Sequence, residues 1–244
     1  MVRLLLMWET QNAPFTNMKI MKFLKEILHI IISFIENKKL YVNGICFEKT
    51  RSYRINQIYN YYYIIKNTIK FYKVYTPSEK YNKKFSDSIK HAKNASVSPL
   101  LRLNKLLKFL NIKFKDYNFL DLGSGQGISL HFVLDNYHFK NYYGLEFDEY
   151  LIDISKKNLF PLKKKFKIIH NDARKFFLED SRYVIYLYNP FDKIILKQFL
   201  ENNLNLLKKN ECIIIYQNNF HAKYIERISK KEILIENGLS IYYF

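Results

Sequence analysis

The chain has 244 residues, of which 48% are hydrophobic and 25% are charged. This length predicts one large domain or one domain with an appendage, and the composition excludes wholesale disorder and fibrous repeats. Lysine and arginine outnumber aspartate and glutamate by 40 to 22, a formal net charge of +18. Two distant cysteines and no recognisable secretory signal exclude a disulfide scaffold, so we expect a reducing, cytoplasmic setting.

The positive charge is typical of proteins that bind one of two kinds of partner, nucleic acid or an anionic membrane surface. Residues 1–95 carry 17 basic and 6 acidic side chains, whereas residues 96–244 carry 23 and 16. Lysine, asparagine, isoleucine, tyrosine and phenylalanine are abundant throughout, so a background bias in composition accounts for much of the lysine. Nucleic acid therefore remains an alternative partner and is not the favoured one.

The first long pattern, from Met18 onward, predicts an amphipathic helix. Its apolar residues recur at helical spacing: Phe23, Leu24, Ile27, Leu28, Ile31, Ile32 and Ile35. The longest uninterrupted apolar run, Ile30–Ile32, is far shorter than the roughly 20 residues that span a bilayer, so a transmembrane segment is excluded. We expect the apolar stripe to pack on the rest of the protein, with peripheral membrane contact as the alternative.

Residues 41–95 interleave many aromatic side chains with lysines. A surface that stacks bases or sugars is one interpretation, and core packing with solvated lysines is the favoured one. We expect only helical segments here, followed by a polar loop at residues 78–96. The sequence therefore predicts an N-terminal, mainly helical region over residues 1–95, which covers the acceptor site or binds a partner, and a second domain over residues 96–244.

The second domain alternates apolar, β-rich runs with helical stretches. Ser98-Pro99 is a helix start, because a serine can cap free amides and proline already has a helical φ. Seven runs predict strands: 118–122, 142–146, 166–170, 183–188, 212–216, 233–235 and 241–244. Such alternation predicts an α/β fold with a mostly parallel seven-stranded sheet flanked by helices. In that architecture ligands bind at the carboxyl ends of the strands.

The stretch Asp121-Leu-Gly123-Ser124-Gly125-Gln-Gly127 leads from the first of these strands into an apolar helix. Glycines allow a backbone to approach a ligand closely, and the amides at a helix start are donors. Isoleucine follows the third glycine where the dinucleotide fingerprint requires glycine, and no Gly-Lys-Ser/Thr follows, which excludes a P-loop. We expect a ligand-binding loop, with a structural turn as the alternative.

Two carboxylates follow at the ends of the next two predicted strands. Glu146 lies 25 residues after Asp121, where a carboxylate can accept hydrogen bonds from both hydroxyls of a ribose. Asp172-Ala173 follows the third predicted strand, where the carboxylate is placed to hold an adenine. A helix cap near Glu149 is the alternative role for Glu146.

A fourth element, Tyr188-Asn189-Pro190-Phe191, ends the buried strand that begins at Tyr183. Proline stops the strand and fixes the chain direction, so Asn189 is expected at the rim of the pocket, with Phe191 as an apolar wall. A simple strand-to-helix turn is the structural alternative.

Together these motifs resemble those of the class I S-adenosylmethionine-dependent methyltransferases, over residues 96–244. The resemblance implies a Rossmann-like fold and S-adenosylmethionine as cofactor. It implies that Asp121 and the loop Gly123, Ser124, Gly125 and Gly127 bind the methionine part, that Glu146 binds the ribose, and that Asp172 and Ala173 lie near the adenine.

Asn189-Pro190-Phe191 resembles a variant of the Asn/Asp-Pro-Pro-Tyr/Phe motif of amino-methylating members, without its second proline. The strand ending in Tyr188, the upstream Ser-Pro and a later Tyr216-Gln-Asn are similar to those of a group of bacterial methyltransferases. The reaction is therefore expected, but the methyl acceptor stays unidentified: a saccharide, small molecule or protein side chain is favoured, and a nucleic-acid base is an alternative.

Displacement of a methyl group from a sulfonium requires alignment and exclusion of water more than a base. An amine acceptor would be oriented by Asn189, with the aromatic faces of Tyr188 and Phe191 near the developing positive charge. A hydroxyl acceptor would need a base, for which His170, Asp192 and His221 are the candidates. No spacing of histidine, cysteine and carboxylate predicts a metal site. A cofactor-binding fold that serves as an interaction module is the non-enzymatic alternative.

Overall fold

The computed structural model describes residues 39–42, 45–48, 59, 60, 62–64, 66, 67, 69 and 100–244, apart from 189 and 237. The chain divides into two compact units, Met1–Tyr63 and Ile64–Phe244. The predicted amphipathic helix after Met18 and the Ser98-Pro99 helix start lie outside the described residues. The predicted division of the chain after residue 95 stays a prediction.

The first unit contains a β-hairpin formed by β1 (Lys39–Val42) and β2 (Ile45–Glu48). The strands pair antiparallel, with Lys39 opposite Glu48 and Val42 opposite Ile45. The prediction of only helical segments from residue 41 is wrong here. The two residues between the strands are Asn43-Gly44, and Asn-Gly is the sequence most typical of a two-residue hairpin connection.

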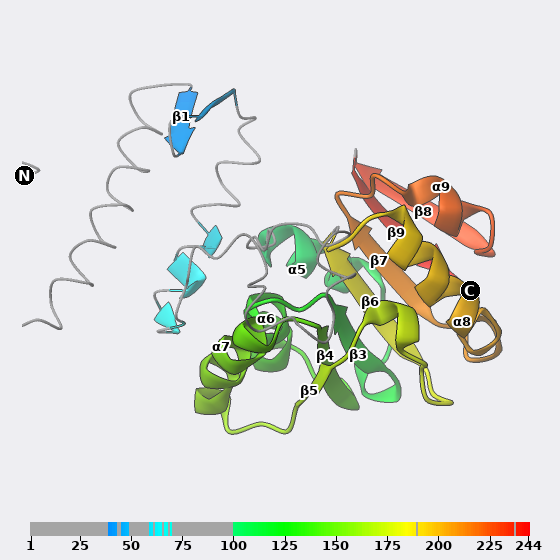
Figure 1. The fold of residues 1–244 in the computed structure, drawn as a ribbon, viewed down its shortest axis with the longest axis horizontal. Helices are drawn as coiled ribbons and strands as arrows, with labels where there is room; N and C mark the ends of the chain where they lie inside the picture. The colour runs from blue at the N-terminus through cyan, green and yellow to red at the C-terminus, as the bar shows by residue number, and fades with distance from the viewer. Residues whose placement is uncertain are drawn as a thin grey trace, which may run out of the picture. The chain divides into compact units, whose positions relative to one another are not determined.

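In the described part of the second unit, seven strands form one sheet in the order β5-β4-β3-β6-β7-β9-β8 (Figure 1). Their bounds lie within two residues of the predicted ones: β3 Asn118–Leu122, β4 Asn141–Glu146, β5 Lys167–His170, β6 Tyr183–Tyr188, β7 Ile213–Gln217, β8 Lys231–Glu236 and β9 Leu239–Tyr243. Only β9 runs antiparallel to its neighbours in this sheet. When β3 to β9 are renumbered 1 to 7 in chain order, the order across the sheet is 3-2-1-4-5-7-6. This order confirms the predicted Rossmann-like class I methyltransferase fold.

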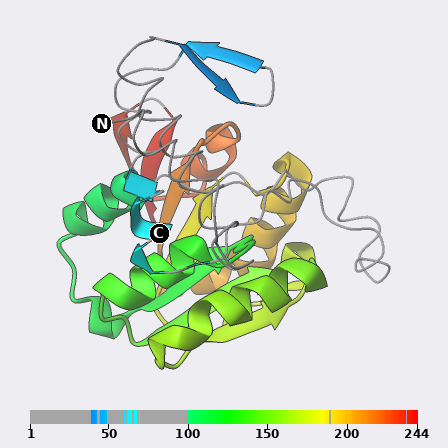
Figure 2. The same cartoon turned by 90° about the vertical axis from the view of Figure 1, so that its left-hand side faces the viewer.

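Helices cover both faces of the sheet. Their bounds are α5 Leu100–Phe109, α6 Ile128–Asn136, α7 Glu149–Leu159, α8 Lys193–Lys209 and α9 Ala222–Glu226. Helices α6 and α7 lie on one side, and α8 and α9 on the other (Figures 1 and 2). Asp148 caps α7 and Asp192 caps α8, each accepting hydrogen bonds from two amides of the first turn, which fixes where both helices begin.

The hydrophobic core holds the strands rigidly in this order. On the α8 side, alternate residues of three central strands pack against the helix; Leu120, Ile185, Ile214, Phe199 and Leu207 are all fully buried. Each such side chain contributes about 1.5–3 kcal/mol on burial. The carboxyl ends of the strands are therefore fixed relative to one another, and with them the side chains that follow.

Candidate active site

The strand register brings the predicted site residues to one edge of the sheet. Asp121 pairs with Gly144 on β4 and with Tyr186 on β6. Two residues further along β4 and β6, Glu146 pairs with His170 on β5, and Tyr188 pairs with Gln217 on β7. Because these five strands are parallel, residues separated by up to 96 positions in sequence share the carboxyl edge, as the sequence predicted.

The glycine loop connects β3 to α6 with three glycines at positive φ. Gly123 has φ +80°, and a Cβ there would overlap with Pro190, which follows β6. Gly127 has φ +74°, and a Cβ there would overlap with Ser155 Oγ on α7. Only glycine permits both the left-handed backbone and these close approaches. The loop is therefore packed tightly between two other segments.

Gly125 differs from its two neighbours in this loop. Its φ is +52°, but no atom of the described residues lies within 4 Å of a Cβ built on it. Its amide donates a hydrogen bond of 2.8 Å to Glu146 Oε2. The middle of the loop thus faces open space beside a carboxylate, as expected for a loop that cradles a ligand.

Glu146 is buried and held by backbone amides. Its Oε1 accepts hydrogen bonds from the amides of Phe147 (2.9 Å) and Asp148 (3.0 Å), in addition to the bond from Gly125 to Oε2. Burial raises the pKa of Glu146 to about 7, although these amides oppose the shift. The alternative role as a helix cap does not apply, because Asp148 caps α7.

Asp121 carries a buried atom without a hydrogen-bond partner. The residue is 4% exposed, and its Oδ2 has no partner among the described residues. Burial, and then the neighbouring charge of Glu146, raise the pKa of Asp121 to about 8. A buried, unpaired carboxylate oxygen is costly, and such an atom calls for a missing cationic or hydrogen-bonding partner.

A pocket of about 310 Å³, including its open mouth, lies beside these carboxylates. Its lining residues are Gly123, Leu145, Glu146, Phe147, Asn171, Asp172, Ala173, Phe191 and Ile195. Five of them were predicted as site residues, whereas Leu145, Phe147, Asn171 and Ile195 were not.

The four lining residues that the sequence did not predict fall into two kinds. Leu145, Phe147 and Asn171 each adjoin a predicted carboxylate in the sequence, so the local motif contained a usable signal. Ile195 lies on the first turn of α8, and it reaches the pocket only because α8 packs across the sheet. No sequence-local signal marks it.

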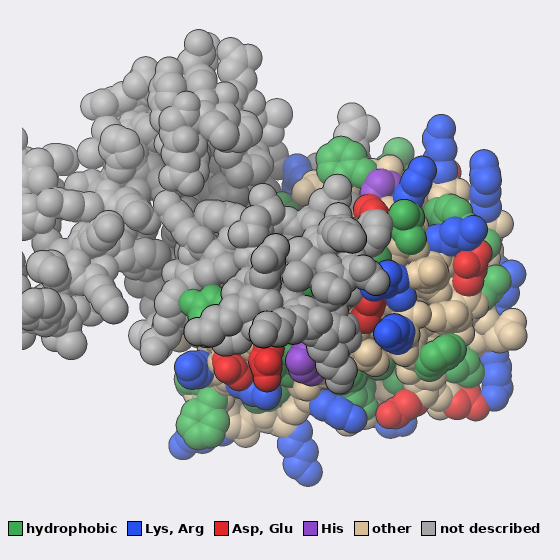
Figure 3. Space-filling view, viewed as in Figure 1, with side chains coloured by type: hydrophobic (Ala, Val, Ile, Leu, Met, Phe, Trp, Pro, Cys, Tyr) green, Lys and Arg blue, Asp and Glu red, His purple; other side chains and the backbone are tan. Residues whose placement is uncertain are grey.

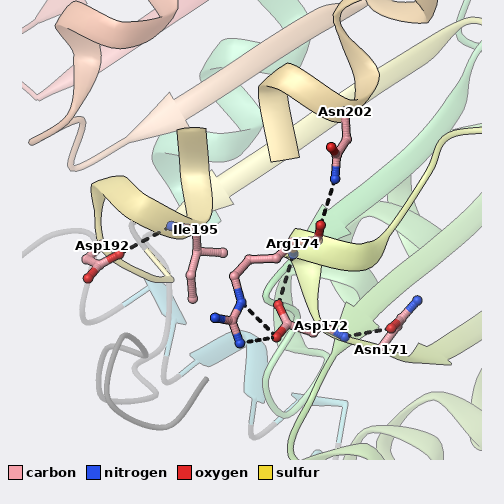
Figure 4. A network of polar contacts seen from close by, with 6 residues as sticks. All are labelled: Asn171, Asp172, Arg174, Asp192, Ile195 and Asn202. Atoms are coloured by element: carbon pink, nitrogen blue, oxygen red, sulfur yellow. Dashed lines mark hydrogen bonds and ion pairs between the residues drawn. The ribbon is translucent and has the colours of Figure 1, made fainter. Parts of the chain in front are cut away.

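Asp172 follows β5 and is 2% exposed. Its Oδ1 accepts a hydrogen bond from the amide of Arg174 (2.9 Å). Asp172 thereby caps the short 3₁₀ helix η4 (Ala173–Lys175). Its Oδ2 accepts from Arg174 Nε (2.9 Å) and Nη2 (2.6 Å), as Figure 4 shows. The predicted adenine-binding carboxylate is thus the partner of an arginine.

The ends of β6 and β7 form the other half of the edge. Tyr188 ends β6 and is partly exposed, and Phe191 lines the pocket, whereas Asn189 lies outside the described residues. Gln217, at the end of β7, is fully buried, and its Oε1 accepts a hydrogen bond of 2.8 Å from the hydroxyl of Tyr186. Its Nε2 has no partner among the described residues.

The three candidate bases lie in different surroundings. His170 Nε2 is 3.1 Å from the carbonyl oxygen of Phe147, and the carboxylate of Asp192 accepts bonds from the first turn of α8. His221 is the partly exposed residue at the start of α9. Their roles stay predictions.

The described residues also bear on the other sequence predictions. None of the helices described is long and apolar enough to cross a membrane. In the same residues, histidine, cysteine and carboxylate side chains form no group of three suited to a metal ion. On the face in Figure 3, lysine and arginine side chains are spread among acidic ones rather than gathered in one place.

Comparisons with known proteins find only distant likenesses, among solved structures. No protein-family model matches the chain, and no curated protein matches it significantly. Among solved structures, an RNA methyltransferase from Salinibacter ruber in complex with S-adenosylhomocysteine is 14% identical, with a TM-score of 0.43 over 61% of this chain and 92% of that one. A putative RNA methyltransferase from Pyrococcus horikoshii is 18% identical, with a TM-score of 0.47 over 76% and 96%.

A 16S rRNA N2 methyltransferase from T. thermophilus, in complex with AdoMet and guanosine, is also similar. It is 18% identical, with a TM-score of 0.49 over 61% of this chain and 44% of that one. These likenesses are all below 25% identity and below a TM-score of 0.5. The fold of this chain is therefore defined by its own strand order, and nothing about its acceptor follows from the neighbours.

Proposed function

We propose that this chain binds S-adenosylmethionine at the carboxyl edge of the sheet and catalyses transfer of its methyl group to an acceptor. The observation that carries the proposal is the convergence at one edge of an open glycine loop, two buried carboxylates and a pocket. The class I methyltransferase strand order supports it, because in this architecture the ligand lies where the strand order reverses.

The residues present fit this cofactor. The unpartnered Oδ2 of Asp121 is suited to the ammonium group of the methionine part, and the space beside Gly125 accommodates a ligand that approaches the backbone closely. Glu146, oriented by three backbone amides, accepts from the ribose hydroxyls. Phe147, Phe191 and Ile195 supply apolar walls for a flat base in the pocket.

When bound, S-adenosylmethionine would supply an electrophilic methyl group on a sulfonium, with S-adenosylhomocysteine as the leaving group. The chain's own contribution is alignment and exclusion of water. Tyr188, Asn189, Pro190 and Phe191 are proposed to position the acceptor, because Tyr188 ends β6, the other three follow it, and Pro190 packs against the loop at Gly123.

The acceptor class is proposed from the sequence. A saccharide, small molecule or protein side chain is favoured, and a nucleic-acid base is the alternative. Residues 1–95 are proposed to cover the acceptor site or to bind a partner. The non-catalytic interaction module, peripheral membrane contact and the cytoplasmic location stay predictions.

The test is methyl transfer from tritiated S-adenosylmethionine. The purified protein is incubated separately with total bacterial RNA, dialysed bacterial protein, cell-envelope polysaccharide and a small-molecule extract. We expect incorporation into at least one of these pools, and we expect Glu146→Ala to abolish it. Glu149→Ala, an exposed carboxylate three residues further along, is the matched control and should retain activity.

Two results would contradict the proposal. One is a folded wild-type protein that neither binds S-adenosylmethionine nor transfers methyl groups to any pool. The other is full activity of Glu146→Ala. Incorporation into RNA alone, weakening steeply with salt, would establish the nucleic-acid alternative.

A further inference from the structure

An ion pair beside the pocket joins two residues of one short segment, Asp172 and Arg174. Arg174 gives three donors to the carboxylate of Asp172: its amide to Oδ1, and its Nε and Nη2 to Oδ2. The arginine side chain is 21% exposed and the aspartate side chain is 2% exposed. The ion pair is therefore largely withdrawn from solvent, where charge-assisted hydrogen bonds are strongest.

Arg174 is itself held from a second direction. Its carbonyl oxygen accepts a hydrogen bond of 2.7 Å from Nδ2 of Asn202 on α8. Figure 4 shows the arginine main chain facing Asn202 and its side chain folded back onto Asp172, with Ile195 beside it. Two elements thus fix the arginine, and the arginine fixes the rotation of the carboxylate of Asp172, a residue of the pocket lining.

We infer that Arg174 is a positioning residue for base recognition: it holds the Asp172 carboxylate so that the pocket selects a purine with an exocyclic amine over one with a carbonyl. This inference rests on the proposed function. An ionised carboxylate only accepts hydrogen bonds. The amine of adenine donates to it, whereas the carbonyl oxygen of hypoxanthine would face it acceptor to acceptor.

Removal of the guanidinium should abolish this selection. In Arg174→Met the stem of the side chain is retained, but the Asp172 carboxylate loses the two charged donors of the guanidinium and keeps the bond from the amide of residue 174. A buried carboxylate that loses its counter-charge takes up a proton. The resulting acid can donate to a carbonyl oxygen, so the preference between the two purines should largely disappear.

The experiment is calorimetric titration with S-adenosylhomocysteine and with S-inosylhomocysteine, its deaminated analogue. We expect the wild-type protein to prefer the adenine compound by about 10- to 100-fold, the value of one hydrogen bond to a charged group. In Arg174→Met the ratio should fall to nearly one. Arg174→Lys keeps the charge without the fork of donors and should give an intermediate ratio.

Arg182→Met is the matched control. Arg182 forms an exposed ion pair with Glu211 (2.9 Å), outside the pocket lining, so this variant should keep the wild-type ratio. Thermal unfolding of each variant verifies the fold. If Arg174→Met does not fold, the affinity ratio of Arg174→Lys for the two compounds is the test.

The ratio separates positioning from a merely structural role. An equal loss of affinity for both compounds in Arg174→Met, with the ratio retained, would overturn the inference while the proposed function stands. A wild-type ratio near one would also overturn it. A wild-type protein that binds neither compound would overturn the proposed function together with the inference.

Discussion

The two halves of the carboxyl edge are stabilised by different kinds of contact. On the cofactor side, the ends of β3, β4 and β5, the functional side chains bond mainly to nearby backbone or to a near neighbour, as Glu146 does with Phe147 and Asp172 with Arg174. On the acceptor side, the ends of β6 and β7, the hydrogen bond between Tyr186 and Gln217 joins residues 31 positions apart.

This difference separates what is locally encoded from what depends on tertiary packing. Most cofactor-side contacts follow from short motifs, because a strand end, a turn and a helix start already orient the carboxylate; the bond from Gly125 to Glu146, which also needs β3 and β4 to be paired, is the exception. The acceptor side has its shape only once β6 and β7 are paired. Gly123 lies where the two sides meet, against Pro190. The variants that follow act on one side, on the other, or on this junction.

The largest effect is expected at the junction. Gly123→Ala places a Cβ onto Pro190 at a residue with φ +80°. The left-handed backbone costs about 1–2 kcal/mol and the overlap about 1–3 kcal/mol, so the free energy of unfolding should fall by about 2–5 kcal/mol. Urea denaturation measures it. An unchanged midpoint would show that the two sides are not packed together as described.

Gly125→Ala should act on binding more than on stability. Its Cβ meets no described atom within 4 Å, so only the backbone term of about 1–2 kcal/mol remains. The same Cβ enters the space proposed for the cofactor, and affinity for S-adenosylhomocysteine should fall at least about tenfold. A variant with wild-type affinity would place the cofactor elsewhere.

The buried carboxylates predict opposite responses to pH for stability and for binding. Burial raises the pKa of Asp121 to about 8 and that of Glu146 to about 7, above their ordinary values. Between about pH 4 and pH 8 the folded state therefore binds more protons than the unfolded state, so the stability of the ligand-free protein falls as pH rises. Cofactor affinity should rise over pH 6 to 8.5, because the ionised carboxylates are the forms that accept from ammonium and hydroxyl groups.

Asp121→Asn is the control for this pH dependence. An amide of the same shape does not titrate, so both slopes should become shallower, and cofactor affinity should decrease. Urea midpoints and calorimetric titrations across the pH range measure the two effects. Slopes equal to those of the wild-type protein would contradict the assignment to Asp121.

The smallest effect is expected on the acceptor side. Gln217→Leu removes an unpartnered Nε2 and the acceptor of the Tyr186 hydroxyl. Removal of the unpartnered Nε2 removes its desolvation cost, which offsets the lost hydrogen bond to Tyr186. The free energy of unfolding should therefore change by less than about 1 kcal/mol. Affinity for S-adenosylhomocysteine should not change, because β6 separates β7 from the cofactor side. A loss of that affinity would extend the cofactor site to β7.

The same contrast explains what the sequence predicted and what it did not. The seven strands and the edge that carries Asp121, Glu146 and Asp172 were predictable, because apolar runs, glycines and strand-end acids are local signals. The hairpin at Asn43-Gly44 was also marked locally and was missed among the aromatic residues around it. Ile195 was unpredictable, since only the packing of α8 brings it to the pocket.

The pairing of Arg174 with Asp172 falls between these cases. The two residues are two positions apart, but an aspartate followed by an arginine is common in any sequence. Its meaning depends on the 3₁₀ turn that brings the guanidinium back to the carboxylate and on the bond from Asn202. The sequence therefore predicted the carboxylate and not the group that orients it.

The central claim is that this edge of the sheet binds S-adenosylmethionine. Calorimetric titration of the wild-type protein and of Glu146→Ala with S-adenosylhomocysteine tests it most directly. We predict micromolar binding by the wild-type protein, weakened about 100-fold by the loss of two charge-assisted hydrogen bonds to the ribose. A folded wild-type protein without measurable binding, or equal affinity of the two proteins, would contradict the claim.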